Sequence, residues 1–193
     1  MRIISFDIGI KNFAYVIIDV NKDKKIHIIE DWGILELCPK EKNASKVDVI
    51  EIGKNMIIKL DELLKEKEKL DLILIENQIG QNAIRMKSVQ GMVSMYFLMR
   101  EYDIKDIVNY NAIHKLKNFK HLFEGKPKTT YSERKKMSKN VCLELVKNTY
   151  TDYDTFYSKN KKKDDLADCL LQCLDYLYKN KMLEKEFFEL IQI

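Results

Sequence analysis

A chain of 193 residues, of which 46% are hydrophobic, is the size of one domain and can fill one sizeable core, so we expect a single domain over residues 1–193. The 34 basic and 30 acidic side chains leave a net charge of +4, a mildly basic balance that does not by itself identify a polyanionic partner. The content of 6 Gly and 2 Pro excludes collagen-like and low-complexity chains, and the lack of an apolar run of about 18 residues predicts a protein without a membrane anchor, made in a cytosol-like compartment.

The beginning of the chain is expected to form three successive strands, because its apolar runs are short and rich in β-branched residues. Gly9 lies in the turn between the first two runs, and a hairpin turn is expected at residues 21–23. The expected strands cover residues 3–6, 13–20 and 26–35. Strands that follow one another without a helix predict an antiparallel start to the sheet.

From residue 46 onward, segments with helical periodicity alternate with short apolar runs. One of these runs is unbroken, as in a strand that is buried on both faces of a sheet. The expected helices cover 46–69, 88–102, 133–147 with Ser132 as N-cap, and 164–178, and the expected strands are 72–75 and 107–110. This order predicts an α/β fold with a mixed sheet.

Four carboxylates stand where the apolar pattern predicts apolar side chains. Asp7 and Glu76 follow apolar strands, and Asp165 and Asp168 share one face of the last helix. A turn explains Asp7 taken alone, and helix capping explains Asp165 equally well. Asp164 is an additional acid, and its spacing to Asp168 would also place both on one face, although we prefer the D-x-x-D spacing.

If the two strands are neighbours, these carboxylates converge, and they could not all stay ionised without a multivalent cation. Carboxylate ligands suit Mg²⁺, for which Mn²⁺ can substitute. Two such ions can clamp the attacking and leaving oxygens of a phosphodiester displacement. The sequence therefore predicts phosphodiester hydrolysis.

The segments FDIGIKNFAY, LILIENQ and KKDDLADCLLQ resemble, in order and context, the three acidic motifs of RuvC-like Holliday junction resolvases in the ribonuclease H-like superfamily. Together with TTYSERKK, they are most similar to the poxvirus-type resolvases and their mitochondrial relatives. The resemblance covers nearly the whole chain. It implies a ribonuclease H-like fold, with a central five-stranded mixed sheet of three antiparallel and then two parallel strands, flanked by helices.

The resemblance also implies a structure-selective DNA endonuclease. Such an enzyme resolves four-way junctions by paired symmetrical nicks, through two-metal-ion hydrolysis, in viral genome concatemer processing and recombination. It implies a homodimer acting on branched DNA in the host cytoplasm. The implied metal ligands and catalytic carboxylates are Asp7, Glu76, Asp165 and Asp168.

The family also has a lysine after the fifth strand, near the scissile phosphate. Lys115, Lys117 and Lys120 follow that strand here, and the spacing from Glu76 slightly favours Lys117 over Lys115 as the catalytic lysine. A solvated lysine is the alternative for each. The expected DNA contacts are Gln78, Gln81, Asn82, Lys120, Lys128, Arg134, Lys135 and Lys136.

Most of these lysines belong to the basic stretch 105–139, in which aromatic residues are interleaved with the charges. This pattern indicates phosphate contacts and base stacking, although a solvated lysine face and core aromatics explain it about as well. Two other function classes remain open. One is an actin-like ATPase or kinase, which also begins with strand, Asp-x-Gly, strand, and the other is a non-catalytic nucleic-acid-binding module of the same fold.

Overall fold

The computed structural model describes residues 1–21, 23, 26–38, 43, 46–80, 83–123, 130–189 and 191. The expected hairpin turn at residues 21–23 lies partly outside these ranges. None of the described helices is both long enough and apolar enough to cross a bilayer.

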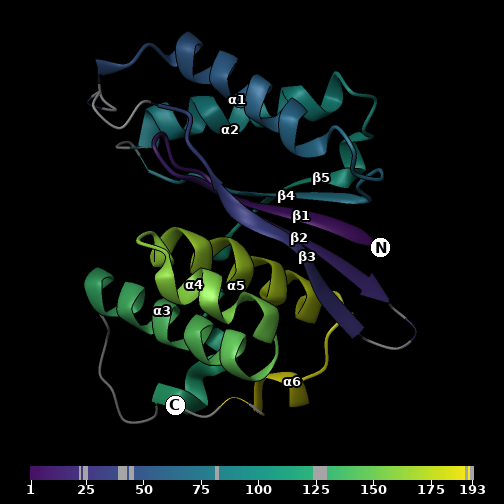
Figure 1. The fold of residues 1–193 in the computed structure, drawn as a ribbon, viewed down its shortest axis with the longest axis vertical. Helices are drawn as coiled ribbons and strands as arrows, with labels where there is room; N and C mark the ends of the chain where they lie inside the picture. Colours follow the sequence, from purple (N-terminus) through teal and green to yellow (C-terminus); the bar gives the residue numbers. More distant parts are fainter. Residues whose placement is uncertain are drawn as a thin grey trace.

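A mixed five-stranded sheet forms the centre of the molecule (Figure 1). Its order is β3-β2-β1-β4-β5, in which β1 pairs antiparallel with β2 and parallel with β4. β2 and β3 are antiparallel, and β4 and β5 are parallel, so the expected arrangement is confirmed. The strands are β1 (Arg2–Asp7), β2 (Phe13–Asn21), β3 (Ile26–Leu35), β4 (Leu72–Glu76) and β5 (Ile107–Tyr110).

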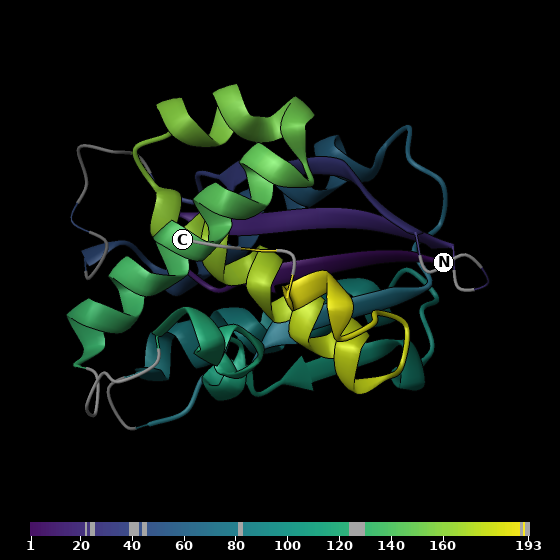
Figure 2. The same ribbon diagram turned by 90° about the horizontal axis from the view of Figure 1, so that it is seen from below.

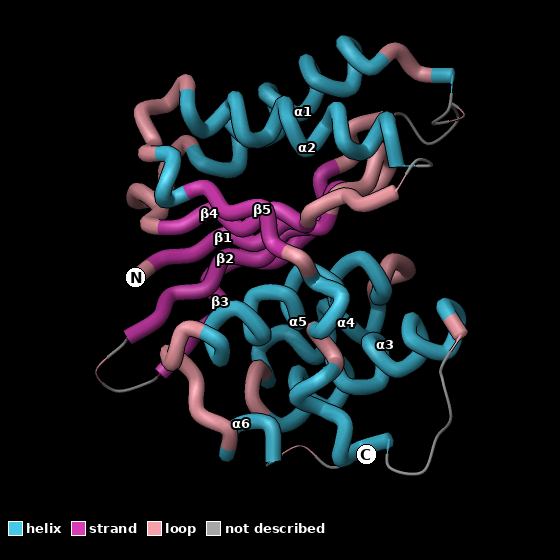
Figure 3. The backbone as a smooth tube through the Cα atoms, turned by 180° about the vertical axis from the view of Figure 1, so that it is seen from behind, coloured by secondary structure: helices cyan, strands magenta, loops and turns pink. Residues whose placement is uncertain are grey.

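Helices cover both faces of this sheet (Figures 1 and 3). On one face lie α1 (Val49–Leu64) and α2 (Ile84–Leu98), and on the other lie α3 (Tyr131–Asn148), α4 (Asp154–Lys159) and α5 (Lys163–Lys179), with α6 (Glu186–Glu189) near the C-terminus. Seen from below, α3 and α5 lie across the strands (Figure 2). Short 3₁₀ turns lie at Ile104–Asp106, Ala112–His114, Lys117–Phe123 and Thr151–Tyr153.

Alternation along the strands builds a core on each side of the sheet. Ile3 packs in the cluster that includes α3 and α5, whereas Ile4 and Phe6 pack in the cluster that includes α1 and α2. Because successive side chains of a strand point to opposite faces, β1 is buried on both sides. A polar side chain is tolerated at such a position only if it has a hydrogen-bond partner inside the protein. Ser5 is a buried polar side chain of this kind.

Three helices differ from the expectation in their limits. The first runs from Val49 to Leu64 and is shorter at both ends than the expected 46–69. The N-cap of α3 is Thr130 rather than Ser132, because Thr130 and Glu133 form a reciprocal capping box. The second helix begins at Ile84 and ends at Leu98, earlier at both ends than the expected 88–102.

The turn between β1 and β2 requires Gly9, since a Cβ there would run into the backbone carbonyl of Asn12.

Candidate active site

Two carboxyl groups meet at the carboxyl ends of the central strands. β1 and β4 are parallel neighbours in the register Phe6 to Ile75, so Asp7 and Glu76 leave the sheet side by side. Burial, a hydrogen bond to Glu76 and the negative charges of Glu76 and Asp168 all raise the pKa of the Asp7 carboxyl well above its usual range. Burial of this kind favours the protonated form of Asp7.

Helix α5 brings a third carboxylate to these two. The Ser5 hydroxyl on β1 donates to the carbonyl of Cys169 at 2.9 Å, and the Gln172 amide donates to the Ser5 hydroxyl at 3.0 Å and to the Phe6 carbonyl at 3.2 Å. These bonds are buried, and they join α5 to the end of β1. Asp168 is thereby held close enough to raise the pKa of Asp7.

One lysine lies among the three carboxylates. The Lys115 ammonium is 2.8 Å from Asp168, and the two side chains are only 14% and 19% exposed. Burial lowers the pKa of Lys115, but the charges of Asp168, Glu76 and Asp7 outweigh it and raise that pKa overall. Lys117, which the spacing favoured, is exposed, so the structure places Lys115 at the acidic cluster instead. We define the acidic cluster as Asp7, Glu76 and Asp168 together with Lys115.

A buried carboxylate that sequence reasoning missed holds the segment that carries Lys115. Asp175 on α5 is 2% exposed and accepts hydrogen bonds from Tyr110 at 2.8 Å, Asn118 at 3.1 Å and Lys179 at 2.7 Å. Tyr110 and Asn118 stand on either side of Lys115 in the chain, so Asp175 fixes both ends of this connection. In the sequence, the signal that could have identified Asp175 was an acidic residue inside the apolar stripe of the last helix.

The remaining two acids at the start of α5 have separate surroundings. Asp164 pairs with Lys135 at 2.9 Å, and this lysine outweighs the effect of burial and lowers the pKa of Asp164. Burial and the neighbouring Asp164 charge raise the pKa of Asp165 to about 6. Asp165 lies at the margin of the acidic cluster, because the charge of Asp168 also raises its pKa, but less than the charge of Asp164 does.

The expected DNA contacts fall into several environments. Gln78 is 9% exposed, and its amide donates to Glu76 at 3.1 Å, so it supports a carboxylate of the cluster. Arg134 and Lys136 are exposed on α3, and Lys135 pairs with Asp164. The side chain of Lys120 and the residues Gln81, Asn82 and Lys128 lie outside what the structure describes.

The chemistry of the acidic cluster fits a hard divalent cation. Within the described ranges, no three Asp, Glu, His or Cys side chains stand ready to hold a metal ion, since Lys115 is bound to Asp168 and Asp7 is hydrogen-bonded to Glu76. The donor set is nevertheless three carboxyl groups, and burial together with neighbouring negative charge raises the pKa of two of them, Asp7 and Asp168, so that these two are costly to ionise. A cation bound to oxygen ligands would remove that cost.

Solved structures place this fold in a known class. The fowlpox virus resolvase in complex with Holliday junction DNA superposes with a TM-score of 0.62 at 19% identity, over 93% of this chain and 99% of that one. RuvC of Thermus thermophilus superposes with a TM-score of 0.57 at 15% identity, over 94% of this chain and 96% of that one. The chain therefore has the ribonuclease H-like fold of these two proteins, as expected.

Sequence comparison identifies the family within that class. Residues 1–180 match the family described as "Poxvirus A22 protein", and the chain belongs to it. The mitochondrial cruciform cutting endonuclease 1 of Schizosaccharomyces pombe is 26% identical over 204 residues, which is 88% of this chain and 75% of that protein.

The buried bonds between β1 and α5 can be tested by stability. Ser5→Ala removes a donor to Cys169 and an acceptor for Gln172, and a buried polar group left without its partner costs about 1–3 kcal/mol. In a chain of this size, each kcal/mol lowers Tm by about 2–4 °C. Ser88→Ala, which removes an exposed bond within α2, is the matched control and is expected to leave Tm nearly unchanged in thermal unfolding by circular dichroism. Equal Tm values for the two variants would contradict the role of Ser5.

Proposed function

We propose that this protein is a structure-selective DNA endonuclease that resolves four-way junctions by paired, symmetrical nicks. The observation that carries the proposal is the convergence of Asp7, Glu76 and Asp168 around Lys115 at the carboxyl ends of β1 and β4. Membership of the A22 family supports it, as does the similarity to a cruciform cutting endonuclease and to a resolvase solved with junction DNA.

Asp7, Glu76 and Asp168, with Asp165 at their margin, would hold two Mg²⁺ ions, for which Mn²⁺ can substitute. Bound there, the ions would supply a water of lowered pKa and offset the negative charge that develops on the phosphate. Gln78 would orient Glu76 through the hydrogen bond between their side chains. Lys115 would stabilise the additional negative charge of the transition state, because burial strengthens the interaction of its ammonium with an anion.

The first prediction from this proposal concerns Asp7. On a synthetic four-way junction with Mg²⁺, the protein is expected to cut two opposite strands at symmetrical positions and to leave the matched linear duplex intact. Asp7→Asn is expected to lower the cleavage rate by about a thousandfold or more, because several kcal/mol of transition-state stabilisation are lost. Junction affinity, measured by gel shift, should stay close to that of the wild type, since Asp7 holds metal and not DNA.

Controls for this prediction separate the competing functions. Hydrolysis of ATP without nicking would favour the actin-like ATPase, and junction binding without nicking would favour the non-catalytic module. A readout that needs no activity is Tm: Mg²⁺ at about 100 times its Kd is expected to stabilise the wild type by about 2.7 kcal/mol. Asp7→Asn should lose most of that increase, and an equal increase in both proteins would contradict the metal assignment.

The second prediction separates the two candidate lysines. Lys115→Gln is expected to lower the cleavage rate by about 10²–10³, as for removal of a donor to a developing oxyanion. Lys117→Gln, on an exposed side chain two residues later, is expected to change it by less than about threefold. Single-turnover cleavage measures both rates, and Tm values confirm that both variants are folded. An unchanged rate in Lys115→Gln would refute its role.

Paired nicks require two active sites in one complex, so we also propose that the enzyme is a homodimer. A groove of about 590 Å³ between α1 and α2 supports this, because apolar side chains remain exposed around it. Ile50 is 75% exposed and Met99 is 79% exposed, and both line this groove. A second copy bound at this face would cover them and would leave the edge of the sheet with the acidic cluster open to DNA.

The third prediction tests that face. Ile50→Glu and Met99→Glu together are expected to convert the dimer to a monomer, because a carboxylate would be buried in an apolar contact. Ile28→Glu, on β3 away from the groove, is the control, since Ile28 is 63% exposed and its substitution should leave the dimer intact. Sedimentation equilibrium measures the mass. A dimer that persists in the double variant would rule out this interface.

A further inference from the structure

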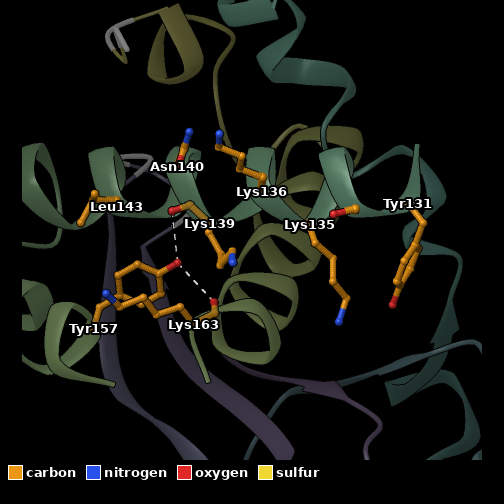
Figure 4. A pocket seen from close by; sticks show the side chains of 9 residues that line it. Tyr131, Lys135, Lys136, Lys139, Asn140, Leu143, Tyr157 and Lys163 are labelled. Carbon is orange, nitrogen blue, oxygen red and sulfur yellow. Dashed lines mark hydrogen bonds between the residues drawn. The ribbon is translucent and has the colours of Figure 1, made fainter. Parts of the chain in front are cut away.

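A basic pocket lies beside the acidic cluster, between α3 and the beginning of α5 (Figure 4). Its volume is about 650 Å³, and four of its nine lining residues are lysines: Lys135, Lys136, Lys139 and Lys163. None of the nine is acidic. We call this site the lysine pocket.

Three of these lysines lack an internal counter-ion. Lys136, Lys139 and Lys163 form no ion pair with any residue that the structure describes, whereas Lys135 pairs with Asp164. Lys139 and Lys163 are also partly buried, which weakens their hydration. Ammonium groups that share a concave site repel one another, so the pocket is electrostatically suited to an anion of more than one charge.

The walls of the pocket are fixed to one another. The Tyr157 hydroxyl is within 3.2 Å of the backbone carbonyls of Lys139 on α3 and Lys163 on α5, and it is shared between them (Figure 4). The Tyr157 ring stacks on Trp32 with centroids 5.4 Å apart. The two lysines are therefore held on opposite walls by an anchored aromatic side chain, which lowers the conformational cost of binding a ligand between them.

The lysine pocket is adjacent to the acidic cluster along α5. Lys135 of the pocket pairs with Asp164 on this helix, and its charge also lowers the pKa of Asp168 in the acidic cluster. At the other end of the pocket, Tyr131 is 68% exposed beside Lys135 and offers a ring on which a base can stack (Figure 4).

We propose that the lysine pocket binds the phosphodiester backbone of the strand being cut, at phosphates next to the one at the acidic cluster. Lys136, Lys139 and Lys163 contact the phosphates, and Tyr131 stacks on a base. This inference rests on the proposed function and adds Lys139 and Lys163 to the expected DNA contacts, of which Lys136 is already one. Lys139 and Lys163 were absent from the expected DNA contacts, because one is an ordinary helix lysine and the other belongs to a run of lysines at 161–163.

The test measures DNA affinity against salt for Lys139→Gln and Lys163→Gln. Each substitution removes one phosphate contact and is expected to lower the slope of log K against log salt by about 0.9, or about 0.7 for a single strand. Because Tyr157 binds the main-chain carbonyls of these residues, glutamine leaves the pocket walls in place. Lys65→Gln, at an exposed lysine that follows α1 on the other side of the sheet and outside the groove, is the matched control and should keep the wild-type slope. Fluorescence anisotropy in EDTA, with a labelled four-way junction and a labelled single strand, gives the affinities.

The outcomes separate this inference from the proposed function. If the wild type cuts junctions but both pocket variants keep its slope and affinity, the lysine pocket is refuted while the nuclease stands. If the wild type does not cut but the two variants lose affinity and slope, the pocket binds a strand and the nuclease is refuted. If a mononucleotide binds in a way that depends on Lys139 and Lys163 while the DNA slopes are unchanged, the pocket is a small-phosphate site and the proposal is overturned.

Discussion

The buried hydrogen bonds between β1 and α5 are the constraint on which the site depends. Ser5 is fully buried in a central strand, and an unpaired hydroxyl there would be costly, so its bonds to Cys169 and Gln172 fix where the helix lies on the sheet. A helix turned by one residue would lose these bonds and would also rotate Asp168 away from Asp7. The same hydrogen bonds therefore give the buried polar groups their partners and set the separation of the Asp7 and Asp168 carboxyl groups.

The close approach of Asp168 to Asp7 is electrostatically unfavourable when no cation is bound. The surrounding structure compensates for this repulsion. Lys115 is held against Asp168, and its segment is fixed at both ends by Asp175. Asp175 is itself compensated, because Lys179 and two neutral donors surround it. The lysine of the acidic cluster is thus supported by a second buried carboxylate, Asp175, whose own charge is balanced locally.

The sequence predicted the sheet and its carboxylates because acids that interrupt apolar runs are conspicuous. It did not distinguish Lys115 from Lys117, since the connection after β5 consists of 3₁₀ turns without periodicity, and only tertiary pairing with Asp168 distinguishes them. The limits of α2 were missed because the helix has apolar side chains on both faces, one against the sheet and one around the exposed groove. The Thr130 cap could have been read from the T-x-x-E pattern with Glu133.

The charges along α5 and α3 also constrain how a DNA strand and metal ions could be accommodated together. If a bound cation kept all three carboxyl groups ionised, the acidic cluster with its Lys115 ammonium would carry two net negative charges, which one divalent ion would neutralise. A phosphate that then entered would restore negative charge, so its binding requires either a second ion or cations nearby. The lysine pocket would supply such cations, and its Lys135 pairs with Asp164 at the beginning of α5. Under the proposed function, metal and DNA would therefore bind to adjacent sites of opposite sign that this ion pair connects.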